Sequence, residues 1–148
     1  MTTSGEFQMF LNTALTHCLE AVPMQKKLTI SVVAVNLNEE HTIKNVLKDI
    51  PSYVDEVLVI DGYSKDRSPL IAKELGFPVI LQEGKGRGAA FKTGFKHTKG
   101  DLIVMLSTDG NERSADIDKL VKKIREGYDL VIASRFGQGK SHDVTPIR

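Results

Sequence analysis

The stretch LTISVVAVNLNEE, residues 28–40, decides the fold class of this chain. It opens with a run of apolar and β-branched residues, Thr29–Val35, and then turns into polar residues that begin a segment with helical spacing, Glu39–Asp49. A strand that is apolar on both faces and leads into a helix is typical of a parallel sheet covered on both sides. Residues 28–40 therefore predict the first strand–helix unit of an α/β domain.

The same alternation of apolar runs and helical segments continues along the chain. Further strands are expected at Glu56–Asp61, Pro78–Leu81, Leu102–Leu106 and Leu130–Ala133, and further helices at Asp66–Leu75, Gly88–Lys96 and Ser114–Glu126. This order predicts a doubly wound, mostly parallel sheet with helices on both faces, which is a Rossmann-like α/β arrangement. Ligands bind such sheets at the carboxyl ends of the strands, so the functional residues should follow each strand.

The residues before this domain predict an amphipathic helix. Apolar residues recur at helical spacing from Thr3 to Val22, Thr3 and Glu6 have the spacing of a capping box, and Pro23 ends the segment. We expect this helix to pack on the domain or to join two subunits into a homo-oligomer. A helix on a membrane surface is the less favoured alternative, because its polar face lacks Lys and Arg. The expected organisation is helix and linker in residues 1–26, the α/β domain in 27–140 and a short tail in 141–148.

Composition excludes several classes of protein. The 148 residues are 41% hydrophobic and 26% charged, which is ordinary for a globular domain. The 20 Lys and Arg against 19 Asp and Glu give a net charge of +1, which argues against a nucleic-acid binder that relies on bulk positive charge. Cys18 is the only cysteine, so neither an intrachain disulfide nor a cysteine-rich zinc site can form. With no apolar run near the length of a membrane span and no Lys or Arg before Lys26, a cytoplasmic location is expected.

Acidic and amide side chains follow the first two predicted strands. Asn38 suits a helix N-cap and Glu39 suits the positive end of that helix, although the pair could also hold a base or ribose. Asp61 ends the second strand with no evident capping role, whereas Asp66 is expected to cap the next helix. An acid in the position of Asp61 often binds ribose hydroxyls. Asn38, Glu39 and Asp61 are therefore candidate nucleotide ligands.

The segment GKGRGAA, residues 84–90, follows the third predicted strand. Its glycines leave backbone N–H groups free to surround an anion at a helix N-terminus, and Lys85 and Arg87 add positive charge. The spacing is that of neither a Walker loop nor a dinucleotide fingerprint. Lys85 and Arg87 are candidate phosphate ligands, with a flexible loop that binds nothing as the alternative.

The ends of the last two predicted strands carry Asp109 and Arg135. A lone carboxylate that faces phosphates can hold Mg²⁺ or Mn²⁺, with diphosphate oxygens and water completing the shell. The alternative for Asp109 is a plain turn, because Asp-Gly-Asn favours one. Arg135 could face the same diphosphate or form an ion pair on the surface.

Taken in order, these motifs resemble those of the family 2 glycosyltransferases, which have the GT-A fold, and most closely the branch of the dolichyl-phosphate-mannose synthases. The resemblance covers about residues 28–140 and is carried by Asn38-Glu39, Asp61, Gly84–Ala89, Gly100-Asp101, Asp109-Gly110, Asp129 and Ser134-Arg135. It implies that residues 27–140 bind a nucleotide sugar. The implied nucleoside ligands are Asn38, Glu39 and Asp61, and Lys85 and Arg87 would lie near the diphosphate. Asp109, as ligand of Mg²⁺ or Mn²⁺, and Arg135, on the phosphate or acceptor side, are the implied catalytic residues.

The resemblance implies a metal-assisted, hexosyltransferase-like enzyme. It would move a sugar from a GDP- or UDP-sugar to a glycan or to a polyprenyl phosphate, in which case it would work at the membrane surface. Family domains extend further than this chain, so the donor half is expected to be present and activity to be low. The alternative is a domain that binds a nucleotide sugar without transfer. A sugar nucleotidyltransferase is disfavoured, because its Gly-rich loop would directly follow the first strand.

The chain departs from the family pattern at two strand ends. Ser107 stands where the family has the first Asp of Asp-x-Asp, which removes one charged metal ligand. The second-strand motif of the family reads Asp-Asp-Gly-Ser-Thr-Asp-Gly-Thr. Here Asp61, Ser64 and Asp66 match it, whereas Gly62 replaces the second Asp and Tyr63 replaces the first Gly.

Overall fold

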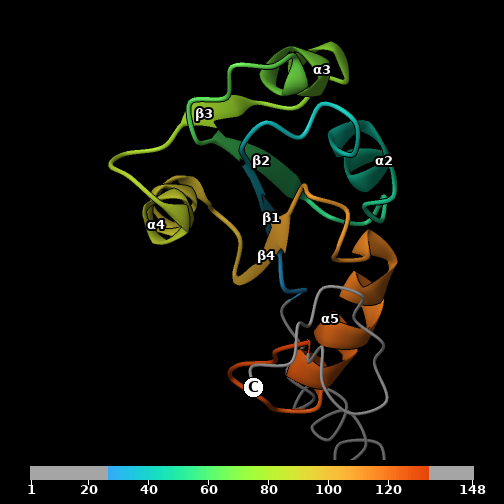
Figure 1. Cartoon of the computed structure of the whole chain (residues 1–148). Helices are drawn as coiled ribbons and strands as arrows, with labels where there is room; N and C mark the ends of the chain where they lie inside the picture. Colours follow the sequence, from blue (N-terminus) through green and yellow to red (C-terminus); the bar gives the residue numbers. More distant parts are fainter. Residues whose placement is uncertain (1–26, 134–148) are drawn as a thin grey trace, which may run out of the picture.

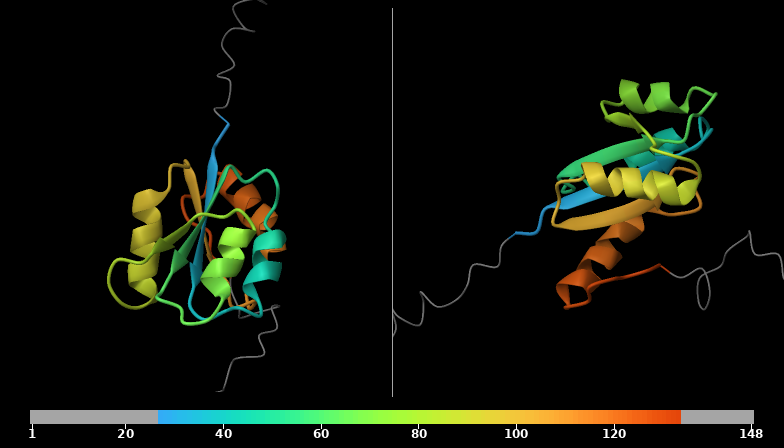
Figure 2. Two further views of the ribbon diagram at one scale, coloured as in Figure 1. Left: turned by 90° about the horizontal axis from the view of Figure 1, so that it is seen from above. Right: turned by 90° about the vertical axis from the view of Figure 1, so that its left-hand side faces the viewer.

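The computed structural model describes residues 27–133, which form a four-stranded sheet with helices on both faces (Figures 1 and 2). The strands are β1 (Ile30–Asn36), β2 (Glu56–Asp61), β3 (Val79–Leu81) and β4 (Leu102–Ser107). The helices are α2 (Ile43–Lys48), α3 (Ser68–Glu74), α4 (Arg87–His97), the 3₁₀ helix η1 (Ser114–Asp116) and α5 (Ile117–Arg125). Every strand pair in these residues is parallel, so the predicted α/β class is confirmed.

The strand order β3-β2-β1-β4 creates a switch point at β1. The chain runs outward from β1 through β2 to β3, and α4 then returns it to the other side of β1, where β4 pairs. The helix that follows β1, α2, and the helix that leads to β4, α4, therefore lie on opposite faces of the sheet. Open α/β sheets bind their ligands in the crevice that such a reversal leaves.

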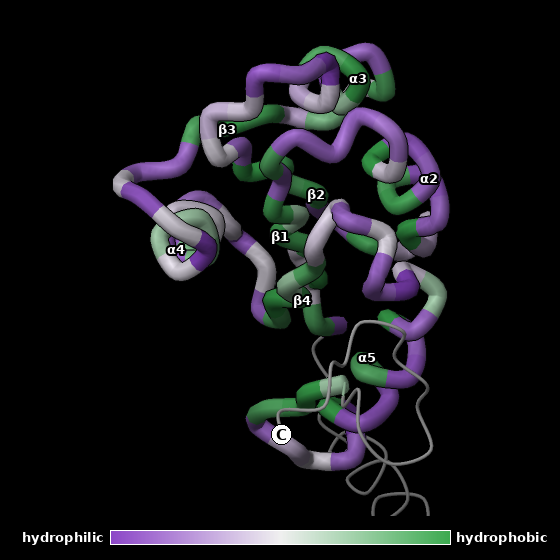
Figure 3. The backbone as a smooth tube through the Cα atoms, viewed as in Figure 1, coloured by the Kyte–Doolittle hydropathy of each residue, from purple (hydrophilic) through white to green (hydrophobic). Residues whose placement is uncertain are grey.

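Both faces of the sheet are covered by apolar packing. On one face, α4 places Ala90 against Val33, Leu58 and Ile60. On the opposite face, residues of α2, α3 and α5 pack on the alternate strand positions, and Val32, on β1, is fully buried there. Figure 3 shows the same division, with apolar strands inside and hydrophilic loops at their ends. Because helices cover both faces of the sheet, a ligand can approach it at the loops along its carboxyl edge.

Helix α4 lies unusually close to β1. A Cβ atom on Gly94 would lie 2.3 Å from Cγ1 of Val33, so only glycine permits this approach. The contact fixes α4 on the sheet and with it the Gly-rich loop from which the helix begins. The position of that loop therefore depends on the packing of Gly94, which lies near the other end of the same helix.

The structure corrects two local predictions. Residues 130–133, predicted as a fifth strand, pair with nothing in the described part of the chain, and the side chains of Leu130 and Ile132 are 75% and 77% exposed. Strand propensity is local, whereas a strand also needs a partner, and residues 130–133 form no pair with β4 or any other described strand. Asn38 is not a helix N-cap: it has a φ of 58°, and α2 begins five residues later, at Ile43, with Thr42 as its N-cap.

Other predictions concern residues outside the described range. The amphipathic helix at residues 3–22, the tail at 141–148 and Arg135 all belong to this group, and the proposed division at residues 27 and 140 stays a prediction. None of the helices in residues 27–133 has the length and hydrophobicity that a membrane span requires.

Candidate functional site

A buried set of polar side chains ties together the carboxyl ends of β1, β2 and β4. Asn36 and Asp61 end β1 and β2 as partners in register, and Nδ2 of Asn36 donates to Oδ1 of Asp61 at 2.9 Å and to Oγ of Ser68 at 2.8 Å. Oδ1 of Asn36 accepts the hydroxyl of Thr108 at 2.9 Å. The Ser64 backbone N–H donates to Oδ2 of Asp61 at 3.0 Å, and its hydroxyl donates to Oδ1 at 2.6 Å. We call these five residues the strand-end network.

The strand-end network leaves Asp61 with no room for a ligand in this arrangement. Its side chain is only 1% exposed, and both carboxylate oxygens accept hydrogen bonds from the protein. Burying a carboxylate costs several kcal/mol unless it is hydrogen-bonded, and here Asn36 and Ser64 supply those bonds. Asp61 therefore holds the two strand ends in place from behind the surface.

Asn38 and Asp66 join the loop after β1 to the loop after β2. Oδ1 of Asn38 accepts the Lys65 backbone N–H at 2.8 Å, and Oδ2 of Asp66 accepts the Glu40 backbone N–H at 2.9 Å. Partial burial raises the pKa of Asp66, but hydrogen bonds from the hydroxyl and N–H of Ser68 and from Glu40 outweigh it, so the net pKa lies below its ordinary value. The sequence predicts that Asp66 caps α3, but the N-cap residue is Arg67; Asp66 precedes it and accepts the N–H of Ser68, the first residue of the helix, at 3.0 Å.

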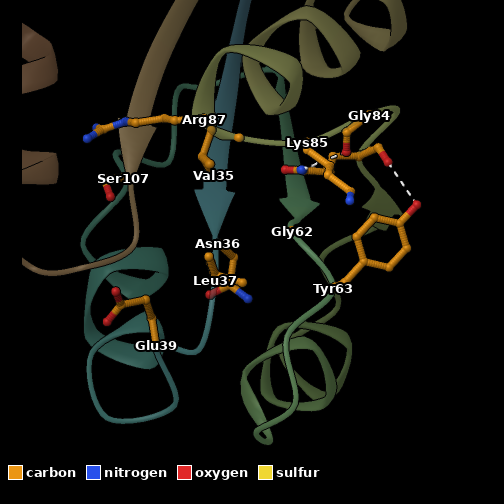
Figure 4. Close-up of a pocket in the computed structure, with 12 residues that line it drawn as sticks. Val35, Asn36, Leu37, Glu39, Gly62, Tyr63, Gly84, Lys85, Arg87 and Ser107 are labelled. Atoms are coloured by element: carbon orange, nitrogen blue, oxygen red, sulfur yellow. Dashed lines mark hydrogen bonds between the residues drawn. The ribbon is translucent and has the colours of Figure 1, made fainter.

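In front of the strand-end network lies a pocket of about 670 Å³ at the carboxyl edge of the sheet (Figure 4). All four strands contribute to it through their last residues or the loops that follow. Its lining consists of Val35, Asn36, Leu37, Glu39, Gly62, Tyr63, Gln82, Gly84, Lys85, Gly86, Arg87 and Ser107. The pocket thus lies at the β1/β4 switch point, where the sheet topology leads us to expect a ligand.

The cationic wall of this pocket comes from the Gly-rich loop. Gly84 and Gly86 have φ values of 93° and 85°, which L side chains rarely adopt, and α4 begins directly after Gly86 with no side chain capping its first turn. Uncapped N–H groups at the start of an 11-residue helix, beside exposed Lys85, attract anions. This wall is suited to phosphate.

Arg87 extends away from Lys85 toward the end of β4 (Figure 4). There its Nη2 atom lies 3.2 Å from Oε1 of Glu112, and its guanidinium carbon lies 5.6 Å from the centre of the Phe91 ring. Oε2 of Glu112 accepts the Ser107 backbone N–H at 2.7 Å. Sequence reasoning missed Glu112, because nothing in the spacing after Asp109 marks it as a partner of a residue 25 positions earlier.

Asp109 follows β4 next to the pocket and does not line it. Its side chain is half-buried, and Oδ1 accepts the Asn111 backbone N–H at 2.9 Å, whereas no hydrogen bond to Oδ2 occurs within residues 27–133. These residues also contain no group of three or more His, Cys, Asp or Glu side chains that could hold a metal. The chemistry of Asp109 fits a hard divalent cation only if a ligand such as a diphosphate completes the shell.

The structure therefore separates the predicted site residues that it describes into three groups. Glu39, Lys85 and Arg87 lie together in the pocket lining. Asp61 is buried behind it in hydrogen bonds, whereas the exposed Asn38 and the half-buried Asp109 lie outside its lining. Sequence reasoning also passed over the exposed apolar residues of the lining, Leu37 and Tyr63. The sequence places an apolar residue just after each of two predicted strand ends, Leu37 after the first and Tyr63 after the second, and that position is the signal that could have identified them.

Known proteins resemble this chain in sequence and in structure. The family described as Glycosyl transferase family 2 matches residues 31–146. Glycosyltransferase AglJ of Haloferax volcanii is 36% identical over 112 residues, which cover 72% of this chain and 36% of that protein. Dolichyl-phosphate hexose transferase of the same organism is 34% identical over 113 residues, which cover 74% of this chain and 49% of that protein.

Solved structures show the same relationship. The crystal structure of Mycobacterium tuberculosis glucosyl-3-phosphoglycerate synthase in complex with UDP superposes with a TM-score of 0.63 at 32% identity, covering 68% of this chain and 41% of that one. A structure of the same synthase with Mn²⁺ and UDP-glucose gives a TM-score of 0.62 at 31% identity, covering 68% and 40%. The chain spans less than half the length of each of these relatives.

Proposed function

The chain belongs to glycosyl transferase family 2, and from this premise we propose that its pocket binds the donor of a sugar transfer, a nucleoside diphosphate sugar. One observation carries the proposal. The pocket at the β1/β4 switch point joins the cationic Gly-rich loop to the acid Glu39 within a single cavity. A nucleotide sugar presents matching groups, an anionic diphosphate and neutral hydroxyls, and the proposed donor is a UDP- or GDP-sugar.

The proposed contacts differ between the residues of the pocket lining and those outside it. Lys85, Arg87 and the first N–H groups of α4 bind the diphosphate, because their charges and dipoles are opposite to its own. The Glu39 carboxylate accepts hydrogen bonds from ribose hydroxyls. Asn38 and Asp61 support the nucleoside by holding the loops after β1 and β2, which are the surfaces that it would touch.

The proposed metal is Mg²⁺ or Mn²⁺, held by Asp109 together with the diphosphate. When bound, such a cation neutralises the negative charge that develops on the departing nucleoside diphosphate. Ser107 offers a neutral hydroxyl at the end of β4, so Asp109 is the carboxylate that we assign to the metal. The Mn²⁺ in the structure of the synthase with UDP-glucose supports this proposal.

The proposed reaction is attack by an acceptor oxygen on the anomeric carbon of the sugar. The bond to the diphosphate oxygen breaks, and the nucleoside diphosphate leaves with the electron pair. A polyprenyl phosphate is the acceptor that we favour, and it places the protein on the cytoplasmic surface of a membrane. A phosphate oxygen is already anionic near neutral pH, so this acceptor needs no strong general base. We assign Arg135 to the phosphate or acceptor side.

Binding and turnover assays on the 148-residue chain test the proposal. In thermal unfolding with UDP-, GDP- and CDP-sugars and Mn²⁺, we expect one donor at 100 times its Kd to add about 2.7 kcal/mol to the free energy of unfolding. Release of nucleoside diphosphate, with and without polyprenyl phosphate, then separates a transferase from a domain that only binds. No stabilisation by any of the nucleotides would contradict the proposal.

A further inference from the structure

Tyr63 is the most unusual residue of the pocket lining. Its φ of 66° lies in the left-handed region, which is uncommon for any side chain and a genuine outlier for a bulky one. The family pattern has glycine at this position, so the chain keeps a glycine-like backbone while it carries an aromatic ring. The side chain is 58% exposed, which makes it an aromatic surface at the rim of the pocket.

Contacts on both sides hold Tyr63 in this conformation. Its hydroxyl donates to the backbone oxygen of Gln82 at 3.2 Å, which joins the loop after β2 to the residue after β3 (Figure 4). The next residue, Ser64, donates its N–H to the buried Asp61. Backbone strain of this kind persists where the surroundings fix it and is concentrated at ligand clamps and active sites. The Tyr63 ring is therefore held in a fixed place in the lining of the pocket.

An open floor separates this ring from a second apolar side chain. Leu37, 54% exposed, lines the same pocket, and Gly62 lies between the two. A Cβ atom on Gly62 would lie 3.4 Å from Cδ1 of Leu37 and 3.3 Å from Oε1 of Gln82, so glycine keeps the floor clear. This end of the pocket thus offers an aromatic face, an apolar side chain and an amide oxygen.

The side of the pocket that carries Tyr63 also carries Lys85, and it lies opposite the side that carries Arg87 and Ser107 (Figure 4). A nucleoside diphosphate combines a planar base with a charged diphosphate, and the pocket offers an apolar surface at Tyr63 and Leu37 as well as the two cations Lys85 and Arg87. We infer that Tyr63 is the residue on which the base of the donor stacks, with Leu37 as the neighbouring apolar contact. The inference rests on the proposed function. Every base has a π-face, so stacking on Tyr63 would favour nucleosides in general. The choice among bases would then depend on polar contacts.

Two variants of Tyr63 separate stacking from other roles. Tyr63→Asn removes the ring and suits the left-handed backbone, and Tyr63→Phe keeps the ring and removes the hydroxyl. In titration calorimetry we expect Tyr63→Asn to bind UDP or GDP about 10- to 100-fold more weakly than the unmodified chain. Inorganic pyrophosphate, which has no base, should bind both equally, and Tyr63→Phe should stay within about threefold for both probes.

Intrinsic fluorescence adds a direct readout, because the chain has three tyrosines and no tryptophan. A base stacked on Tyr63 should quench part of the tyrosine emission of the unmodified chain, whereas pyrophosphate should not. In Tyr63→Phe, UDP should still bind while this quenching disappears. If the ring only supports the fold, UDP should quench the emission no more than pyrophosphate does, and Tyr63→Asn should weaken the binding of the two probes equally.

The outcomes distinguish this inference from the proposed function. Unchanged UDP affinity in Tyr63→Asn, or an equal loss for UDP and pyrophosphate, would overturn the stacking role while leaving the donor site in place. If the unmodified chain binds neither UDP nor GDP, with or without Mn²⁺, both proposals fall. Thermal unfolding of each variant shows whether the fold is retained, and a folded Tyr63→Phe that binds UDP without the quenching supports the inference even if Tyr63→Asn unfolds.

Discussion

Asp61 and Asp109 follow parallel strands at the same edge of one sheet, and their surroundings give them different roles. Asp61 is 1% exposed and accepts hydrogen bonds at both oxygens. Asp109 is half-buried, and its described bond is the one from the Asn111 N–H to Oδ1. A carboxylate at a strand end is therefore not a ligand by virtue of its position. Its exposure and its remaining hydrogen-bonding capacity decide whether it builds the site or binds in it.

The same contrast between buried and more exposed side chains applies along the whole carboxyl edge of the sheet. The strand-end network is buried and joins residues of three strand ends and α3. Lys85, Arg87 and Asp109 form an outer rim of charged side chains, in which Arg87 also pairs with Glu112. Changes in the network should therefore affect folding first and binding as a consequence. Changes in the rim should affect binding alone.

The largest effect is expected from Asp61→Ala. The change removes the acceptor for Asn36 Nδ2 and for Ser64 in a buried network, so it should lower the free energy of unfolding by about 3 kcal/mol. Urea denaturation measures this, with Asp109→Ala as the matched control, which should change stability by less than about 0.5 kcal/mol. An Asp61→Ala chain that is fully stable but no longer binds nucleotide would show that Asp61 is a direct ligand and would break the comparison.

Next in size is Lys85→Ala, which removes a rim charge. We expect UDP to bind about tenfold more weakly, because one charge-assisted contact to phosphate is lost, while the unfolding temperature stays unchanged. Lys92→Ala is the control, since Lys92 is exposed on α4 and does not line the pocket. Equal calorimetric affinities for the two variants would remove Lys85 from the site.

A smaller effect is expected from Asp109→Asn. The amide keeps the turn but lacks the charge that a divalent cation needs, so Mn²⁺ should no longer strengthen UDP binding, a loss of about fivefold. UDP affinity without metal should match that of the unmodified chain. Tight Mn²⁺ binding without nucleotide would instead reveal ligands beyond Asp109, and titration of the metal alone detects it.

The smallest effect concerns acid stability at Asp66. Its pKa in the folded chain lies below the ordinary value of 3.8, so the folded state favours the charged form. This stabilisation is fully present above about pH 4 and is lost as the pH falls through the lowered pKa. Thermal unfolding of Asp66→Asn should therefore show a shallower decrease between neutral pH and pH 3 than that of the unmodified chain. Parallel curves would show that Asp66 contributes nothing to the pH dependence.

Much of the fold could be predicted from local sequence. The apolar runs placed β2 at Glu56–Asp61, the bounds that the structure has, and placed β1 and β4 to within a residue at each end. The same patterns placed Glu39, Lys85 and Arg87 at one edge of the sheet. These features depend on the periodicity of neighbouring residues and on the rule that parallel strands end on the same side.

What only the tertiary structure decided depends on partners that are distant in the chain. Thr108 meets Asn36 across 72 positions, and Glu112 meets Arg87 across 25. Contacts between residues far apart in the chain likewise bury Asp61 and fix the Tyr63 ring at the rim of the pocket. Residues 130–133 have strand-like sequence but no strand partner in the described structure. Propensity is a property of a segment, whereas burial, hydrogen-bond partners and strand pairing are properties of its surroundings, and a single sequence records only the first.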